Sequence, residues 1–254
     1  MCSQHHRPSP AHNQIGPSKR TRVRRKPDRG RYDRDTIYRI LDQALIGHVG
    51  LVADSLPHVT PMVVARRGDE LLLHGSTRSR LMRLLAAGCE VCVAVTHVDG
   101  LIVARSLFDS SLNYRSVTVF GTARPLTAPA DKLGALRTIV EHVLPGRWGE
   151  ARPPSERELR ATAVMSVPLA EASAKVRSGP PQDSKADLGL HVWAGELPLR
   201  VTSLPPVADP LLADDIPLPA SVARFGRFSL LGPEPTPAAS ASHGPDPARP
   251  VTPS

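Results

Sequence analysis

The chain has 254 residues, enough for one large domain or two small ones. Its net charge of +8 gathers at one end: the first 34 residues hold ten of the 32 basic side chains and two of the 24 acidic ones, which leaves 22 of each sign in the remainder. The balanced remainder excludes basicity as an argument for a nucleic-acid-binding domain, and no apolar stretch approaches the roughly 18 to 20 residues of a membrane span.

The basic first segment, residues 1–31, has almost no apolar side chains to bury, so we expect a disordered tail. A basic arm can touch nucleic acid or an acidic membrane surface, but solvated disorder is the interpretation we prefer. No apolar segment of a secretory signal follows the basic run, which indicates a cytoplasmic protein.

A first helix is predicted over residues 32–44, where apolar residues recur at helical spacing and Asp33 or Asp35 can cap the N-terminus. Strands are predicted over 48–53, 58–65 and 70–74. Pro61 lies inside the second of these and cannot donate a ladder hydrogen bond. It therefore marks a sheet edge, a bulge or a place where a ligand replaces the partner strand.

Next come a helix over 78–87 and strands over 89–96, 100–107 and 114–125. The Asp99-Gly100 pair predicts a hairpin between the first two of these strands. Helices follow over 129–143 and from Ser155, whose Glu158 three residues on completes a capping box. A long final strand is predicted over 164–177 and a last ordered element over 191–195.

These elements predict a mainly β protein with peripheral helices, built as a small antiparallel barrel of six or seven strands. The barrel domain should span residues 32–204, followed by a Pro-rich, largely disordered C-terminal tail over 205–254.

Cys89 and Cys92 form a Cys-x-x-Cys pair inside an apolar strand-like run. Positions three apart point to opposite faces of a strand, so the two thiols cannot grip one metal ion. We expect buried structural cysteines and no metal site.

The segment from Leu71 to Leu81 is the strongest functional signal. A short apolar strand ends in His74-Gly75-Ser76, and a run of hydroxyl and arginine side chains, Thr77-Arg78-Ser79-Arg80, leads into a helix. Hydroxyls, free backbone amides, a helix N-terminus and guanidinium groups are suited to a phosphate monoester. An ordinary strand-to-helix connection with solvated arginines is the alternative.

Several segments together resemble a known family. They are His74-Gly75-Ser76, the run through Arg80, residues 99–106, 113–117, Glu141-His142, residues 145–148, 171–177 and 192–195. In this order they are similar to the flavin-nucleotide-binding branch of the pyridoxamine 5′-phosphate oxidase-like superfamily, which is related to the 5-nitroimidazole resistance reductases. The resemblance runs from about Tyr32 to Leu199.

The resemblance implies an FMN-binding split β-barrel that forms a homodimer, with FMN between the subunits. It places Ser76, Ser79 and Arg80 at the phosphate, with Thr77 and Arg78 as near neighbours, and it includes Gly75 among the cofactor-binding residues. It places Thr60, Pro61, Met62 and Val63 along the isoalloxazine, and His74 close to the phosphate or ring edge, where it is also the candidate proton donor.

For the other candidate cofactor residues, a purely structural role is the alternative to cofactor binding. Tyr114 and Arg115 alternate across a strand, so either can reach the cofactor or the dimer contact. Trp148 can stack on the flavin or pack against the barrel. Lys175 and Arg177 share one strand face and can bind an anionic substrate, the flavin pyrimidine edge or only water.

The sequence departs from true pyridoxamine phosphate oxidases, because the cofactor strand carries no starting arginine and the C-terminus is Pro-rich. The leading hypothesis is an FMN-dependent oxidoreductase that passes hydride or electrons from a nicotinamide nucleotide to a small acceptor. The alternatives are a non-catalytic flavin carrier or sensor, or the same barrel binding deazaflavin or haem. For haem, His191 is the only late axial candidate.

Overall fold

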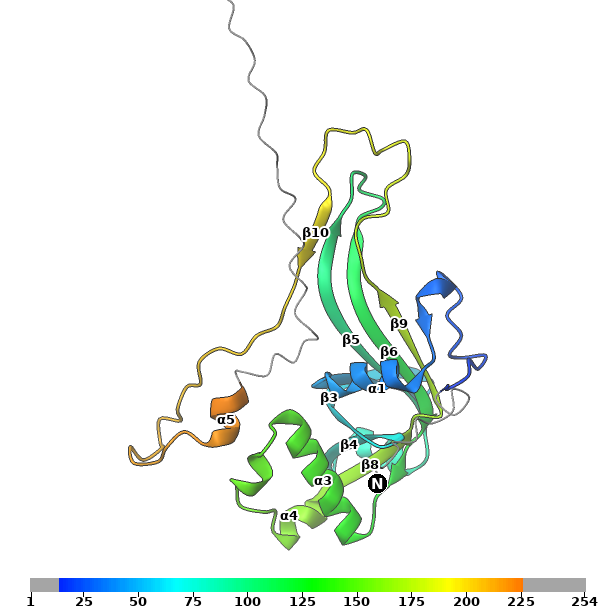
Figure 1. The fold of residues 1–254 in the computed structure, drawn as a ribbon. Coiled ribbons are helices and arrows are strands. Elements are labelled where there is room, and N and C mark those ends of the chain that lie inside the picture. Colours follow the sequence, from blue (N-terminus) through cyan, green and yellow to red (C-terminus); the bar gives the residue numbers. More distant parts are fainter. Residues whose placement is uncertain (1–13, 226–254) are drawn as a thin grey trace, which may run out of the picture.

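In the computed structural model, residues 14–225 are described, and they form one antiparallel sheet with helices at its periphery (Figure 1). The strands of this part of the chain are β1 Gly30–Arg31, β2 Ile46–Ala53, β3 Leu56–Arg67, β4 Glu70–Ser76, β5 Glu90–Val103, β6 Ser111–Thr122, β7 Arg124–Pro125, β8 Thr162–Pro168, β9 Glu171–Arg177 and β10 Gly195–Pro198. The helices are α1 Arg34–Asp42, α2 Arg80–Ala86, α3 Pro129–Val143, α4 Glu156–Ala161 and α5 Ala220–Phe225, with 3-10 turns η2 Pro27–Arg29 and η3 Arg147–Gly149.

The strand order is β1-β9-β6-β5-β2-β3-β4-β8-β7, and β10 pairs with β5 outside this path. The mainly β, antiparallel prediction is therefore confirmed, with more strands than the six or seven expected. None of the helices within residues 14–225 is long and apolar enough to cross a membrane.

The predicted long strand over 164–177 is wrong, because the chain turns at Leu169-Ala170. The first half is β8, which pairs with β4, and the second half is β9, which pairs with β6 on the other side of the sheet. A single apolar run thus serves two strands, since each half has a different partner.

The predicted hairpin at Asp99-Gly100 is also wrong. β5 continues through these residues with a bulge between Val98 and Gly100. The Asp99 carboxylate accepts hydrogen bonds from the Arg115 guanidinium on β6, at 2.9 and 2.8 Å. Gly100 stands close to β10, because a Cβ there would lie 3.1 Å from the Leu197 carbonyl oxygen, a backbone atom that cannot move aside easily.

Two apolar clusters hold the sheet to its helices. The larger lies inside the curved sheet and takes Ile37, Ile40 and Leu41 from α1, whose N-cap Asp33 accepts a hydrogen bond from the Thr36 amide. The smaller lies on the other face of β3, β4 and β8 and is covered by α3 through Ala135 and Ile139. Both helices begin and end within two residues of the predicted bounds.

Residues 14–31 were expected within a disordered tail, but they lie against the sheet. Ile15 is buried in the main cluster and β1 pairs with β9. Arg20 forms ion pairs with Glu90 and Glu171, so part of the basic segment meets acidic partners on the body. The first 13 residues of the predicted tail lie outside the described range.

The C-terminal segment also contains structure where a largely disordered tail was expected. In α5, the buried Ser221 donates to the Glu150 carboxylate from both its amide and its hydroxyl. A largely apolar groove of about 600 Å³ lies between α5, the end of α3 and residues 203–206. Residues 226–254 of the predicted tail lie outside the described range.

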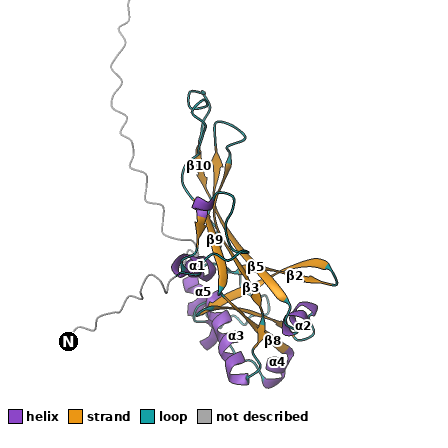
Figure 2. Cartoon of the chain, turned by 90° about the vertical axis from the view of Figure 1, so that its right-hand side faces the viewer, coloured by secondary structure: helices purple, strands orange, loops and turns teal. Residues whose placement is uncertain are grey.

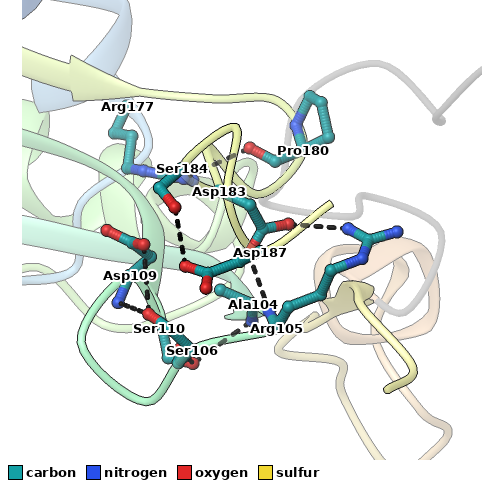
Figure 3. Close-up of polar contacts among 10 residues, drawn as sticks. All are labelled: Ala104, Arg105, Ser106, Asp109, Ser110, Arg177, Pro180, Asp183, Ser184 and Asp187. Carbon is teal, nitrogen blue, oxygen red and sulfur yellow. Dashed lines mark hydrogen bonds and ion pairs between the residues drawn. The ribbon is translucent and has the colours of Figure 1, made fainter. Parts of the chain in front are cut away.

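The long β5–β6 hairpin rises well beyond the main cluster, and a polar cluster fixes its end (Figure 3). Asp183, from the loop after β9, accepts from the Arg105 amide and guanidinium, both at 2.7 Å. The connection between the two strands is closed by Ser106, which exchanges hydrogen bonds with Asp109. Leu107 and Phe108 at the tip are almost fully exposed.

Candidate functional site

The strands β3 and β4 separate part-way along their length. They pair through Val64–Arg67 and Glu70–Leu73, whereas residues 56–63 of β3 pair only with β2 and residues 74–76 of β4 pair only with β8. We call the region between these free edges the β3–β4 fork. The β2–β3 hairpin extends away from the rest of the sheet in Figure 2. Pro61 lies on this free edge. A sheet edge was one of the positions predicted for it, because proline has no backbone N–H to donate to a partner strand.

Side-chain alternation assigns the fork residues to two faces. Leu73 belongs to the main cluster, and a Cβ on Gly75 would meet Met82 of α2 at 3.1 Å, so these positions and the half-buried Met62 face the inside of the sheet. His74 lies opposite Val164 of β8, which belongs to the α3-side cluster, and Val63 packs on the same cluster. The predicted residues Val63 and His74 therefore lie on the α3 side.

The predicted phosphate run follows directly at the end of β4. The Ser76 hydroxyl accepts from the Arg78 amide at 3.2 Å, and the Ser79 side chain makes no capping hydrogen bond although Ser79 is the N-cap of α2. The Arg80 guanidinium is exposed and lies 2.7 Å from Asp54 in the β2–β3 turn. Thr60 and Pro61 are exposed on the neighbouring strand. The Ser79 hydroxyl thus remains available to a ligand, and the Ser76 hydroxyl can still donate. The Thr77 hydroxyl donates to the Ala161 carbonyl at 3.2 Å, and Arg80 already has a carboxylate partner.

His74 lines a cavity of about 290 Å³ between β4, β8 and the segment after α3, which we call the β4–η3 cavity. Its other lining residues are Leu136, Val140, Arg147, Trp148, Ala151, Arg152, Pro153, Pro154 and Thr162. The His74 Nδ1 atom is buried and has no hydrogen-bond partner. Burial lowers the pKa of His74 below its usual range, so the ring is neutral at pH 7.

Trp148 reaches this cavity through a fixed turn. Glu141 of α3 accepts from the backbone amides of Gly146 at 2.6 Å and Trp148 at 3.0 Å. Gly146 has a φ of 92°, a conformation that favours glycine and turns the chain back over the sheet. The structure therefore brings together His74 and Trp148, which lie far apart in the sequence.

The two arginines of the cavity differ in their partners. Arg152 donates two hydrogen bonds to Glu158, at 3.0 and 2.8 Å, and its charge is thereby matched. Arg147 has only a long ion pair of 4.0 Å with Glu150. Arg147 is thus the guanidinium of this cavity that is most available to an anionic ligand.

Four other predicted residues lie elsewhere. Tyr114 pairs with Arg177, and Arg115 and Lys175 flank this pair on β6 and β9, with β5 and β2 between them and β3. Arg115 is engaged by Asp99, and the buried Arg177 donates to Asn113 and to the Gly179 and Pro180 carbonyls. Burial lowers the Arg177 pKa. Within one chain the structure does not bring these four residues to the fork.

The sequence interpretation did not include Arg147, Thr162 or Asp54 in the site. The only feature of the sequence that could have pointed to Arg147 is its position next to Trp148, which was a candidate residue. Thr162 lines the cavity and pairs with Ser76, and Asp54 in the β2–β3 turn contacts Arg80 at the start of α2. Cys89 and Cys92 are half-buried free thiols rather than fully buried ones.

The chain was compared with known proteins. It is similar to the flavocytochrome Anf3 from Azotobacter vinelandii, with 41% identity over 82% of this chain and 97% of that one and a TM-score of 0.79. It is also similar to an FAD and haem binding protein from Mycobacterium smegmatis, with 37% identity over 78% and 97% of the two chains and a TM-score of 0.76. A 5-nitroimidazole antibiotic resistance protein from Bacteroides thetaiotaomicron, at 23% identity over 58% and 86% of the two chains and a TM-score of 0.51, shares the fold.

Among functionally curated proteins, none matches this chain. The sequence profile that matches residues 33–176 is that of pyridoxamine 5′-phosphate oxidase. Because this match covers more than half of the chain and agrees with the two structures above 30% identity, the chain belongs to the pyridoxamine 5′-phosphate oxidase family of split barrels.

Proposed function

We propose that this protein is a redox flavoprotein that binds a flavin nucleotide and a haem, and so works as a flavocytochrome. One observation carries the proposal: the similarity to a flavocytochrome and to an FAD and haem binding protein extends over 97% of each of those chains. A shared barrel alone would support only the flavin.

The flavin belongs in the β3–β4 fork. There the free edge of β3 carries Thr60, Pro61, Met62 and Val63, and the hydroxyls of Ser76 and Ser79 lie at the end of β4. An exposed strand edge offers backbone donors and acceptors to the ring, and hydroxyls with the nearby Arg78 suit a phosphate. FMN satisfies these groups, and FAD adds an adenylate half.

The haem needs an imidazole or another axial ligand and an apolar wall. Six histidines lie within residues 14–225. His97 and His142 already hydrogen-bond backbone carbonyls through Nε2, at 3.0 and 2.6 Å. His74 has no such partner and lines a cavity with Trp148 and two proline rings. The imidazole and the apolar side chains of this cavity therefore suit the chemistry of a haem.

When bound, the flavin supplies two-electron exchange with a donor such as a nicotinamide nucleotide, and the haem iron supplies one-electron exchange with a small acceptor. The protein would hold both groups and keep His74 neutral by burying it. A homodimer with the flavin between subunits agrees with the exposed apolar side chains of the β2–β3 hairpin, Val52, Leu56 and Val59.

Purification tests the proposal directly. The full chain, expressed with haem precursors and riboflavin, should show flavin bands and a Soret band, and mass spectrometry of the released cofactors should identify FAD or FMN together with haem. Protein that lacks both spectra, and that gains neither on titration with FMN, FAD and haemin, would contradict the proposal. Flavin without haem would leave the flavoprotein half standing and remove the flavocytochrome half.

A further inference from the structure

We infer that His74 is the axial ligand of the haem iron and that the haem lies in the β4–η3 cavity with Trp148 against its ring and Arg147 at a propionate. The inference rests on the haem-binding half of the proposed function. It assigns that group to a place in the fold.

The imidazole of His74 is available for coordination. None of its ring nitrogens hydrogen-bonds to any residue in the described part of the chain, and Nδ1 is buried without a partner. A buried polar atom without a partner destabilises the fold, and a bound ligand that uses the group is one reason for a protein to retain it.

The other residues of the cavity suit a haem, which is a planar, mostly apolar group with two negatively charged propionates. Leu136, Val140, Pro153 and Pro154 give apolar walls and Trp148 gives an aromatic face. Arg147 has only the 4.0 Å ion pair with Glu150 and can form a charge-assisted hydrogen bond with a carboxylate. The volume of about 290 Å³ is smaller than a whole haem, so one edge of the macrocycle must protrude.

The other histidines are poorer ligands. His191 is exposed in the loop before β10, outside the residues that line this cavity. His58 has a buried unpartnered Nε2, but it lies on β3 opposite Leu51 of β2 and does not line the cavity either. The structure therefore separates His74 from His191, the one late candidate, and a poor one, that the sequence offered for a haem.

The test compares His74→Ala with His191→Ala in the full chain reconstituted with haemin. Loss of an outer-shell partner of a metal ligand costs about 10–100-fold in affinity, and loss of the ligand should cost at least ~10-fold. We expect His74→Ala to lose haem affinity and to change the Soret band and the electron paramagnetic resonance signal. His191→Ala should match the parent protein.

Three controls keep folding apart from ligation. Flavin binding and the circular dichroism spectrum should persist in His74→Ala, added imidazole should restore the parent spectrum to His74→Gly, and Arg147→Ala should weaken haem binding without changing the ligation spectrum. If the parent binds haem and His74→Ala leaves its spectrum intact, or His191→Ala alone removes it, the inference is overturned while the proposed function stands.

Two further results would also overturn it. The first is that Trp148→Ala weakens the binding of FAD but not that of FMN or haem, which would show that the cavity holds the adenylate half of FAD. The other is a parent protein that takes up flavin but no haem, which refutes the haem-binding half of the proposed function as well.

Discussion

At the scale of single residues, the space around a position decides whether a substitution is tolerated, and the sequence pattern does not show that space. Gly47 lies at the start of β2, where a Cβ would come within 2.6 Å of Val64 Cγ1 and 3.2 Å of Val93 Cγ1. Gly134 lies inside α3, and a Cβ there would meet nothing within 4 Å. The two glycines look alike in the sequence but have opposite structural requirements.

Substituting each glycine by alanine should therefore change stability in opposite directions. Gly47→Ala should destabilise the protein by about 1–3 kcal/mol, because valine side chains in a packed sheet cannot move aside easily. Gly134→Ala should stabilise it by about 0.5–1 kcal/mol through better helix propensity. Urea unfolding of the two variants measures this, and a stabilised Gly47→Ala would contradict the described packing.

His74 shows how far sequence reasoning reaches at this scale. Its position at the end of an apolar strand before Gly75-Ser76 marked it as a candidate residue. Its burial, its unpartnered Nδ1 and its neighbour Trp148 depend on where residues 145–154 fold back over β4. No spacing near residue 74 contains that information, so the cavity could not be predicted.

At the scale of elements, α1, α2, α3 and α4 were predicted well because their signals are local, whereas α5 was missed within the expected C-terminal tail. The capping box of α4 is present with both of its hydrogen bonds, between Ser155 and Glu158. The strands were harder, because Asp99-Gly100 and Leu169-Ala170 take their meaning from partners distant in the chain. Nothing in the neighbouring sequence shows that a turn-forming pair lies inside a long strand. Nothing there shows either that one apolar run is divided between two strands.

The α4 capping box gives a pH-dependent prediction. Hydrogen bonds from Arg152, and then from Ser155, lower the pKa of Glu158 from 4.5 to about 2. A carboxyl with a lowered folded-state pKa stabilises the fold above the unfolded value and loses this contribution as the pH falls from about 4.5 to about 2.

Melting temperatures of the parent and Glu158→Gln should therefore differ at about pH 6 and converge near pH 2. Glu156→Gln is the matched control, because Glu156 is an exposed neighbour on α4 whose ion pair to Arg160 is 3.2 Å long. A constant difference between the parent and Glu158→Gln across this pH range would show that the Glu158 charge does not stabilise α4.

At the scale of the whole molecule, the sheet leaves apolar surface uncovered on the β2–β3 hairpin. Val52, Leu56 and Val59 are 65%, 61% and 67% exposed. β2 pairs with β5 through only His48–Gly50, so little within one described chain supports the hairpin tip. A second copy of the chain is the partner that our proposal gives to this surface.

A charge on this surface should separate the subunits. Val59→Glu should shift the protein from dimer to monomer in size-exclusion chromatography with light scattering, because an unpaired carboxylate is costly inside an apolar interface. Flavin should be lost at the same time if it lies between subunits. Val207→Glu, at an exposed valine in the segment before α5, is the matched control, and an unchanged mass for Val59→Glu would place the interface elsewhere.

The anchoring of α5 links the end of the described chain to the corner that carries Arg147 and Trp148. Ser221 holds Glu150, which follows η3 directly, so this short helix braces the turn from outside. A partner that binds the chain after this helix, or a protease that cleaves it there, would therefore act on the wall of the β4–η3 cavity without contacting a cofactor.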